Sequence, residues 1–156
     1  MTLNVGDNAP DFTLASTHGE LSLAKLREKS EKGVIVYFYP AAMTPGCTTQ
    51  ACDFRDSIGS LVGAGYTVVG VSPDPLEKLE KFSKRDELNF ALAADEDHAV
   101  AEAYGAWGEK KNYGKVYEGL IRSTFVVSPD GTLALTQRNV KATGHVGRLR
   151  KILGLN

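Results

Sequence analysis

The feature that most constrains the fold is a short apolar run followed at once by a helix start. Residues 34–39 (VIVYFY) lie between Gly33 and Pro40. The length of this run and its β-branched and aromatic content predict a strand that is buried on both faces, as in sheets covered by helices on either side. Thr44 is then a good N-cap, and Pro45 suits the first position of a helix. The sequence therefore predicts a buried strand that leads directly into a helix.

The remainder of the chain continues this alternation of strands and helices. Helix signals occur over residues 44–63, 76–82, 97–104 and 146–153, and strand signals over residues 66–71, 91–94, 123–127 and 133–138. Residues 17–20 predict a hairpin tip, and residues 107–117, which are rich in Lys and Gly, predict an exposed loop. The order of elements predicts an α/β fold with a central mixed sheet flanked by helices. The length predicts one domain over residues 1–156.

Composition excludes several classes of function. The 18 basic and 19 acidic residues give a net charge of −1 and are spread along the chain, so we expect no nucleic-acid-binding face. No apolar run approaches the ~20 residues of a membrane helix, and the N-terminal segment lacks the features of a signal peptide. The two cysteines are too few for a Cys-based zinc site. We expect a cytoplasmic protein without a metal or membrane partner.

Cys47 is the strongest candidate for a functional residue. It follows a loop at the carboxyl end of the buried strand, which is where ligands and chemistry gather in α/β folds. Unpaired backbone N–H groups and the helix dipole at this position favour the thiolate, which is the nucleophile. Gly46 would let another group approach closely. The alternative is a buried cysteine that packs as a small apolar side chain.

Cys52 follows five residues later on the same predicted helix. Ideal helix geometry separates the two Cα atoms by roughly 8–9 Å and by about 140° around the axis. A disulfide rarely tolerates more than ~7 Å, so the pair can bond only if this segment unwinds; otherwise Cys52 is an unpaired thiol. The C-x₄-C spacing weakens the interpretation as a C-x-x-C dithiol oxidoreductase. Cys–His catalysis is another option, but His18, His98 and His145 lie in no motif and are expected to be surface or structural histidines.

These residues resemble a known family. Residues 37–40 (YFYP) and 44–48 (TPGCT) resemble the peroxiredoxin pattern P-x-x-x-T/S-x-x-C, and the second cysteine resembles the peroxiredoxin Q or bacterioferritin comigratory protein subfamily. The resemblance extends over essentially the whole chain. Its other segments are residues 6–12 (GDNAPDF), residues 107–114 (WGEKKNYG) and residues 122–125 (RSTF).

The resemblance implies a thioredoxin-like fold and a role for each matched residue. Cys47 would be the peroxidatic cysteine and Cys52 the resolving one. Pro40 would shield the thiolate, Thr44 would hydrogen-bond both the thiolate and the peroxide, and Arg122 would stabilise the thiolate and the developing charge. These groups suit attack on an O–O bond, which needs a thiolate, a hydrogen-bond donor and positive charge near the leaving oxygen.

One position departs from the family pattern. Gln50 stands where many peroxiredoxins carry a glutamate that orients an arginine. A neutral amide can still accept a hydrogen bond from a guanidinium, but it forms no ion pair. The role of Gln50 in orienting the substrate site is therefore an open question at the level of the sequence.

The implied activity is thiol-dependent reduction of hydrogen peroxide and organic hydroperoxides. Cys47 would become a sulfenic acid, Cys52 would resolve it as an intramolecular disulfide, and thioredoxin or a similar dithiol would restore both thiols. No cofactor is implied, because sulfur carries both electrons. We expect a monomer, with a weak dimer as the alternative. Two other functions stay open: a protein-disulfide reductase, disfavoured by the absent C-x-x-C, and a non-enzymatic redox sensor or holdase.

Overall fold

The computed structural model of the chain describes residues 3–112 and 114–155. The strands are β1 (Thr13–Ser16), β2 (Gly19–Ser22), β3 (Gly33–Phe38), β4 (Tyr66–Ser72), β5 (Ala91–Ala94), β6 (Trp107–Asn112), β7 (Lys115–Leu120), β8 (Ser123–Val127) and β9 (Leu133–Arg138). The helices are α1 (Leu23–Lys29), α2 (Pro45–Gly63), α3 (Leu76–Arg85), α4 (Ala99–Ala103) and α5 (His145–Ile152). The predicted alternation of strands and helices is confirmed.

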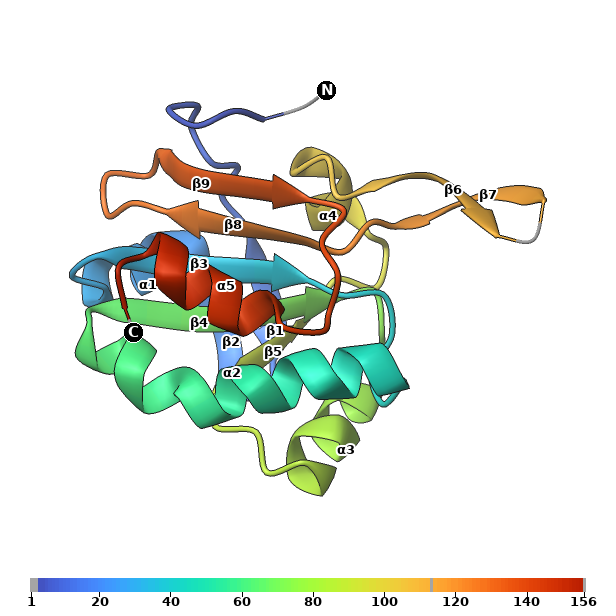
Figure 1. The fold of residues 1–156 in the computed structure, drawn as a ribbon, viewed down its shortest axis with the longest axis horizontal. Coiled ribbons are helices and arrows are strands. Elements are labelled where there is room, and N and C mark those ends of the chain that lie inside the picture. The colour runs from blue at the N-terminus through green and yellow to red at the C-terminus, as the bar shows by residue number, and fades with distance from the viewer. Residues whose placement is uncertain (1–2, 113, 156) are drawn as a thin grey trace.

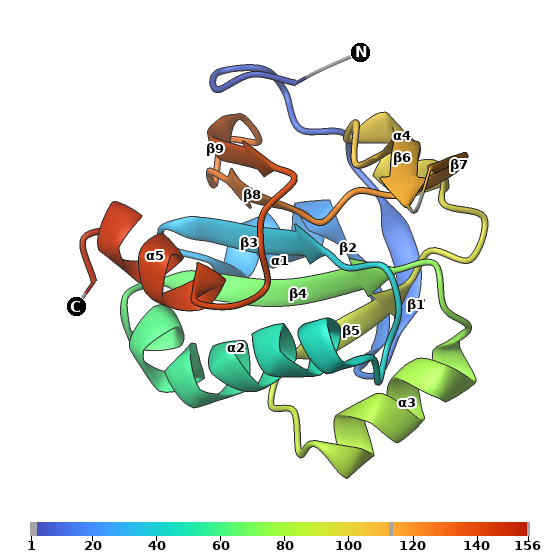
Figure 2. The same ribbon diagram turned by 45° about the vertical axis from the view of Figure 1, so that its right-hand side comes forward.

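Seven strands form one mixed sheet in the order β2-β1-β5-β4-β3-β8-β9. β3, β4 and β5 run parallel to one another, whereas β8 is antiparallel to β3 and β9 is antiparallel to β8. Figures 1 and 2 show α2 and α5 side by side on one face of this sheet, with α1 on the other. The mixed sheet flanked by helices confirms the expected fold class.

The core is divided by β3, every residue of which is buried. Ile35 and Tyr37 face the apolar cluster beneath α2, α3 and α5. Val34, Val36 and Phe38 face a second cluster, which includes residues of α1 and α4. The strand is therefore buried on both faces, as its apolar run predicts.

The segment over residues 107–117 differs from the expected loop. β6 and β7 pair as an antiparallel hairpin from Trp107 opposite Leu120 to Asn112 opposite Lys115, and the hairpin projects from the body of the molecule (Figure 1). Backbone hydrogen bonds hold it together, and most of its β7 side chains are exposed. Because such a hairpin buries little, its sequence carries no alternation of apolar and polar residues. Exposure was expected correctly, but the pairing was not.

Candidate active site

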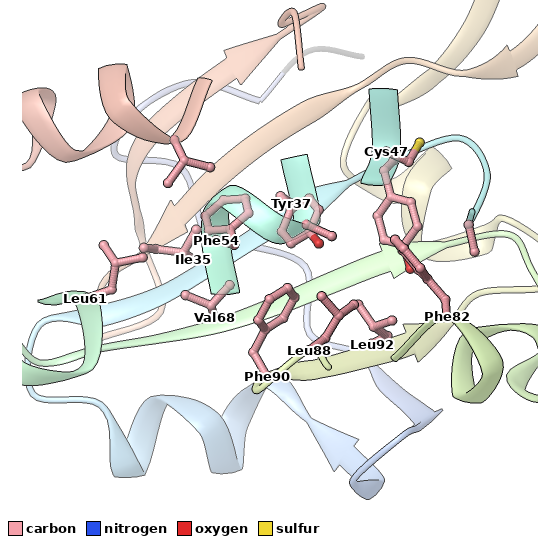
Figure 3. Close-up of a cluster of buried hydrophobic side chains, with 14 of the residues drawn as sticks. Ile35, Tyr37, Cys47, Phe54, Leu61, Val68, Phe82, Leu88, Phe90 and Leu92 are labelled. Carbon is pink, nitrogen blue, oxygen red and sulfur yellow. The ribbon is translucent and has the colours of Figure 1, made fainter. Parts of the chain in front are cut away.

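Cys47 is the third residue of α2 and lies at the carboxyl end of β3, as expected. Only 1% of its surface is exposed, and it lies at the upper edge of the cluster of buried side chains in Figure 3, with its sulfur directed away from them. Pro45 and the Thr44 cap start the helix immediately before it. The thiol therefore lies near the unpaired N–H groups of the first helical turn, where negative charge on sulfur is stabilised.

Arg122, directly before β8, supplies the polar partner of this sulfur. Its Nη2 donates a hydrogen bond to Cys47 Sγ at 3.3 Å, across 75 residues of sequence. A Cβ atom at position 46 would lie 3.4 Å from the same nitrogen and 3.7 Å from the Cβ of Ala142. Both distances are ordinary van der Waals contacts, so the expected close approach at Gly46 stays a prediction. Cys47 therefore has a cationic hydrogen-bond donor, which a cysteine that packs only as a small apolar side chain would not have.

Gln50 is the second partner of the guanidinium. Its Oε1 accepts a hydrogen bond from Arg122 Nη1, and its side chain is fully buried one helical turn after Cys47. Its Nε2 has no hydrogen-bond partner within the described part of the chain. A carboxylate at this position would pair with the arginine and offset its charge. The amide instead accepts the hydrogen bond of Arg122 without offsetting its charge.

Thr44 is placed differently from what the resemblance implies. It occupies the N-cap position of α2, but its hydroxyl donates to the carbonyl oxygen of Ala41 at 2.8 Å. Among residues 3–112 and 114–155 it makes no hydrogen bond to Cys47 Sγ. The structure thus does not show the expected hydroxyl–thiolate contact, because the single hydroxyl hydrogen is used by Ala41. The oxygen of Thr44 can still accept a hydrogen bond from a bound hydroperoxide.

Asp74 is a positioning residue that sequence reasoning did not find. Its Oδ2 accepts hydrogen bonds from the backbone N–H of Ala42 at 2.7 Å and the hydroxyl of Ser72 at 2.9 Å, and Lys78 pairs with Oδ1 at 3.0 Å. The loop that it holds contains Met43 with a φ of 66°, a conformation that most residues avoid. The motif over residues 72–75 (SPDP) predicts a turn, but it does not predict the long-range contact between Asp74 and the backbone of Ala42.

A polar cavity of about 560 Å³ opens beside the guanidinium. Pro40 and Arg122 line it together, and the shielding of the thiolate by Pro40 stays a prediction. Three further cations, Lys110, Lys111 and Arg138, contribute to the same walls, with Glu109 as the acidic member. A largely cationic wall, formed by the hairpin and the end of β9, therefore lies beside Arg122.

Cys52 lies in the same unbroken helix but in different surroundings. It is half-buried, and both cysteines are free thiols. Burial raises the pKa of the Cys52 thiol, Asp86 raises it further, and Arg55 opposes the shift. Since α2 is helical from residue 45 to 63, the two thiols are kept apart by the helix geometry described above.

The histidines were expected to be surface or structural residues, and His145 is a buried structural histidine. Its Nε2 shares a hydrogen bond of 2.8 Å with the hydroxyl of Thr124, in the strand that Arg122 precedes. Burial lowers the pKa of this imidazole to about 4, and the nearby charges of Arg148 and Arg122 act in the same direction. It is neutral at pH 7 and ties α5 to β8.

The other histidines also lack a catalytic arrangement. His98 stacks on Trp107 at a ring distance of 3.8 Å and pairs with Glu102, and His18 is exposed. Within residues 3–112 and 114–155, no histidine is hydrogen-bonded to either cysteine. The same residues contain no group of three or more His, Cys, Asp or Glu side chains that could hold a metal ion. None of their helices is long and apolar enough to cross a membrane.

Comparison with known proteins gives the same family throughout. The family model described as AhpC/TSA matches residues 5–136. Rv2521 of Mycobacterium tuberculosis, which carries a peroxiredoxin name, is 54% identical over 154 residues, covering 98% of this chain and 96% of its own length. The peroxiredoxin Bcp of Bacillus subtilis is 45% identical over 153 residues, with the same coverage of the two chains.

Solved structures agree with the sequence relatives. The bacterioferritin comigratory protein of Xanthomonas campestris, described with its alkyl peroxide reduction activity, superimposes with a TM-score of 0.85 at 33% identity, covering 97% of this chain and 96% of that one. PrxQ of Xylella fastidiosa superimposes with a TM-score of 0.88 at 26% identity, covering 99% of this chain and 97% of that one. The fold is thus the thioredoxin-like fold of these peroxiredoxins.

Proposed function

Because the chain belongs to the AhpC/TSA family, whose members similar to it are peroxiredoxins and hence thiol-dependent peroxidases, we propose that Cys47 is its peroxidatic cysteine. The observation that carries this proposal is the 3.3 Å hydrogen bond from Arg122 Nη2 to Cys47 Sγ at the start of α2. A cationic donor and a helix N-terminus together stabilise the thiolate. They also stabilise negative charge on the oxygen that leaves.

The first step is attack of the Cys47 thiolate on one oxygen of the hydroperoxide. A sulfur–oxygen bond forms, the O–O bond breaks, and the leaving oxygen takes a proton to become water or an alcohol. Sulfur supplies the two electrons and becomes a sulfenic acid. Arg122 holds the charge during this step, and Gln50 orients Arg122. Thr44 would accept the hydrogen bond of the peroxide O–H.

The second step joins the two cysteines. The Cys52 thiolate attacks the sulfenic sulfur of Cys47, a disulfide forms, and hydroxide leaves as water after taking up a proton. The first turns of α2 must unwind for this step, because the helical geometry exceeds disulfide reach. A thioredoxin-type dithiol would then reduce the disulfide. This demand for reduced dithiols suits the cytoplasm, the compartment that we propose.

We propose that both hydrogen peroxide and organic hydroperoxides are substrates. The alkyl peroxide reduction described for the Xanthomonas campestris relative supports the organic substrates. A monomer is the oligomeric state that we propose, because the large apolar side chains that are exposed are few and come from four parts of the chain: the N-terminal segment, α2, β7 and α5. These side chains are Val5, Val62, Val116, Tyr117 and Ile152.

Intact mass measurement and peptide mapping after one equivalent of hydrogen peroxide test the mechanism. A loss of two hydrogens, with a linked peptide that contains Cys47 and Cys52, is the expected result. An added oxygen on Cys47 without a link would instead mean that an external thiol resolves the sulfenic acid. If Cys47 is not modified at all, the proposed peroxidatic role is wrong.

A further inference from the structure

Among the described residues, three side chains of the α2 segment that must unwind make hydrogen bonds to other elements. Cys47 and Gln50 both bind Arg122, which belongs to the proposed chemistry. Between them, Thr48 makes a separate contact: its Oγ1 accepts a hydrogen bond of 2.9 Å from Nη2 of Arg85. This third attachment can be removed without touching the residues that handle peroxide.

Arg85 is the last residue of α3 and is well placed to hold Thr48. Its Nε and Nη2 both donate to Oδ2 of Asp86, at 3.0 and 2.9 Å. Its guanidinium also lies 5.8 Å from the ring centroid of Phe82, a buried side chain of the core. Because these contacts already fix the guanidinium, its hydrogen bond to Thr48 requires little further ordering of the side chain.

A second attachment between the same elements lies on the other side of Cys52. Nη1 of Arg55 donates to the backbone carbonyl of Asp86 at 2.6 Å, and Asn89 Nδ2 donates to the carbonyl of Arg55 at 3.2 Å. Cys52 therefore lies between two points at which α2 is joined to α3 and the segment after it. The later attachment can stay in place while residues 47–52 leave the helix, but the Thr48 contact cannot.

We propose that the Arg85–Thr48 hydrogen bond is a latch that stabilises the closed form of α2 and so lowers the fraction of molecules in which Cys52 can reach the oxidised Cys47. This inference rests on the proposed function, since it concerns the disulfide step of that mechanism. The latch does not act on the first step, because the Thr48 hydroxyl is bonded to α3 and not to sulfur or Arg122. It sets how long the sulfenic acid survives, and hence how often a second peroxide oxidises it to a sulfinic acid.

Thr48→Val tests the latch, because it removes the hydroxyl and keeps the shape and the charge of the chain. Thr49→Val is the matched control, since Thr49 is the exposed neighbour on the same turn. Quenched-flow mass spectrometry would follow the sulfenic acid and the disulfide separately. We expect Thr48→Val to form the disulfide about twofold to fivefold faster, the range for one solvent-exposed charged hydrogen bond. Peroxide attack should be unchanged, and less sulfinic acid should form.

Arg85→Ala supplies the partner variant for a double-mutant cycle. This change also leaves Asp86 unpaired near Cys52, so its own effect on the rate mixes two causes. The cycle removes that ambiguity: Thr48→Val should accelerate the disulfide step in the natural chain and have no effect in the Arg85→Ala background. An equal acceleration in both backgrounds, or none in the natural chain, overturns the latch.

The outcome separates the latch from the mechanism on which it rests. If the unaltered chain forms the Cys47–Cys52 disulfide and Thr48→Val forms it at the same rate, only the latch is wrong. If the unaltered chain forms no such disulfide, the resolving role of Cys52 is wrong and the latch is overturned with it.

Discussion

The first turn of α2 and the turn that follows it place two thiols in opposite surroundings. Cys47 is almost fully buried and faces the guanidinium of Arg122, which no carboxylate neutralises within the described contacts. Cys52 is half-buried on the side of α3, where burial and Asp86 raise its pKa and only Arg55 opposes them. One helix thus presents a thiol in a cationic pocket and a thiol in an acidic neighbourhood.

In the mechanism that we propose, this difference lets a single helix divide two tasks. A thiol that attacks peroxide benefits from a fixed position and from charge that is already in place. A thiol that resolves the product needs access and movement, and it does not need to be ionised until the helix opens. The contacts differ accordingly: Cys47 is held by a residue 75 positions away, whereas Cys52 lies among contacts that join α2 to α3.

The largest expected effect comes from exchanging each sulfur for oxygen. Cys47→Ser should abolish peroxide consumption, because the remaining thiol, Cys52, has no hydrogen bond from a guanidinium among the described residues and its pKa is raised. Cys52→Ser should still consume one equivalent of peroxide and then stop in thioredoxin-supported assays. Stopped-flow kinetics with a coupled reductase assay would measure both. Sustained turnover by Cys52→Ser would remove that residue from the resolving role.

The next largest effect is expected when the guanidinium of Arg122 is removed. Arg122→Ala should slow peroxide attack by about 10²–10³-fold, the usual cost of losing one donor at a developing negative charge. Reduction of the disulfide by a dithiol should change little, since that step takes place after α2 has opened. Single-turnover measurements of each half-reaction would test the difference. A similar loss in both halves would indicate a general folding defect instead.

Lowering the pH should lower the free energy of unfolding, because His145 is buried in its neutral form. The pKa of His145 is about 4 in the folded chain and ordinarily near 6.5, so the unfolded chain binds the extra proton between these values. This contribution to stability is complete above pH 6.5 and is lost as the pH falls toward 4. We expect a loss of about 2–3 kcal/mol in the free energy of unfolding.

His145→Gln is the matched variant for this titration, because an amide can keep the hydrogen bond to Thr124 without titrating. Urea unfolding at pH 7 and at pH 4.5 would measure the two stabilities. The natural chain should lose more stability than the variant over this interval. Parallel losses would show that other groups cause the acid sensitivity.

The smallest expected effect is the pH dependence of the disulfide step. Because the pKa of Cys52 is raised above its ordinary value, only a small fraction of this thiol is ionised at pH 7. The rate of disulfide formation should therefore rise about tenfold per pH unit until that raised pKa is reached. Quenched-flow measurements between pH 7 and 8.5 would test this, and a flat rate over that interval contradicts it.

The elements that carry the site could be predicted because they depend on local chemistry. The apolar run of β3, the Thr44 cap and Pro45 act within a few residues of one another, and β3 and α2 formed where they were expected. The β6–β7 hairpin could not be predicted, since its polar residues pair through the backbone and bury little. Resemblance to a family could supply a role for Thr44, but not the carbonyl that its hydroxyl contacts.

What the sequence by itself determined is a reactive cysteine at the start of a helix, after a buried strand, with a second cysteine beyond disulfide reach on the same helix. These properties follow from residue types and helical spacing. Only the tertiary structure decided which charges surround each thiol. Arg122, Asp74 and Arg85 reach α2 and its entry loop from other elements, and their positions depend on how strands and helices pack across the sheet. Long-range contacts of this kind leave no local pattern, because the chain between the partners can vary while the packing holds them together.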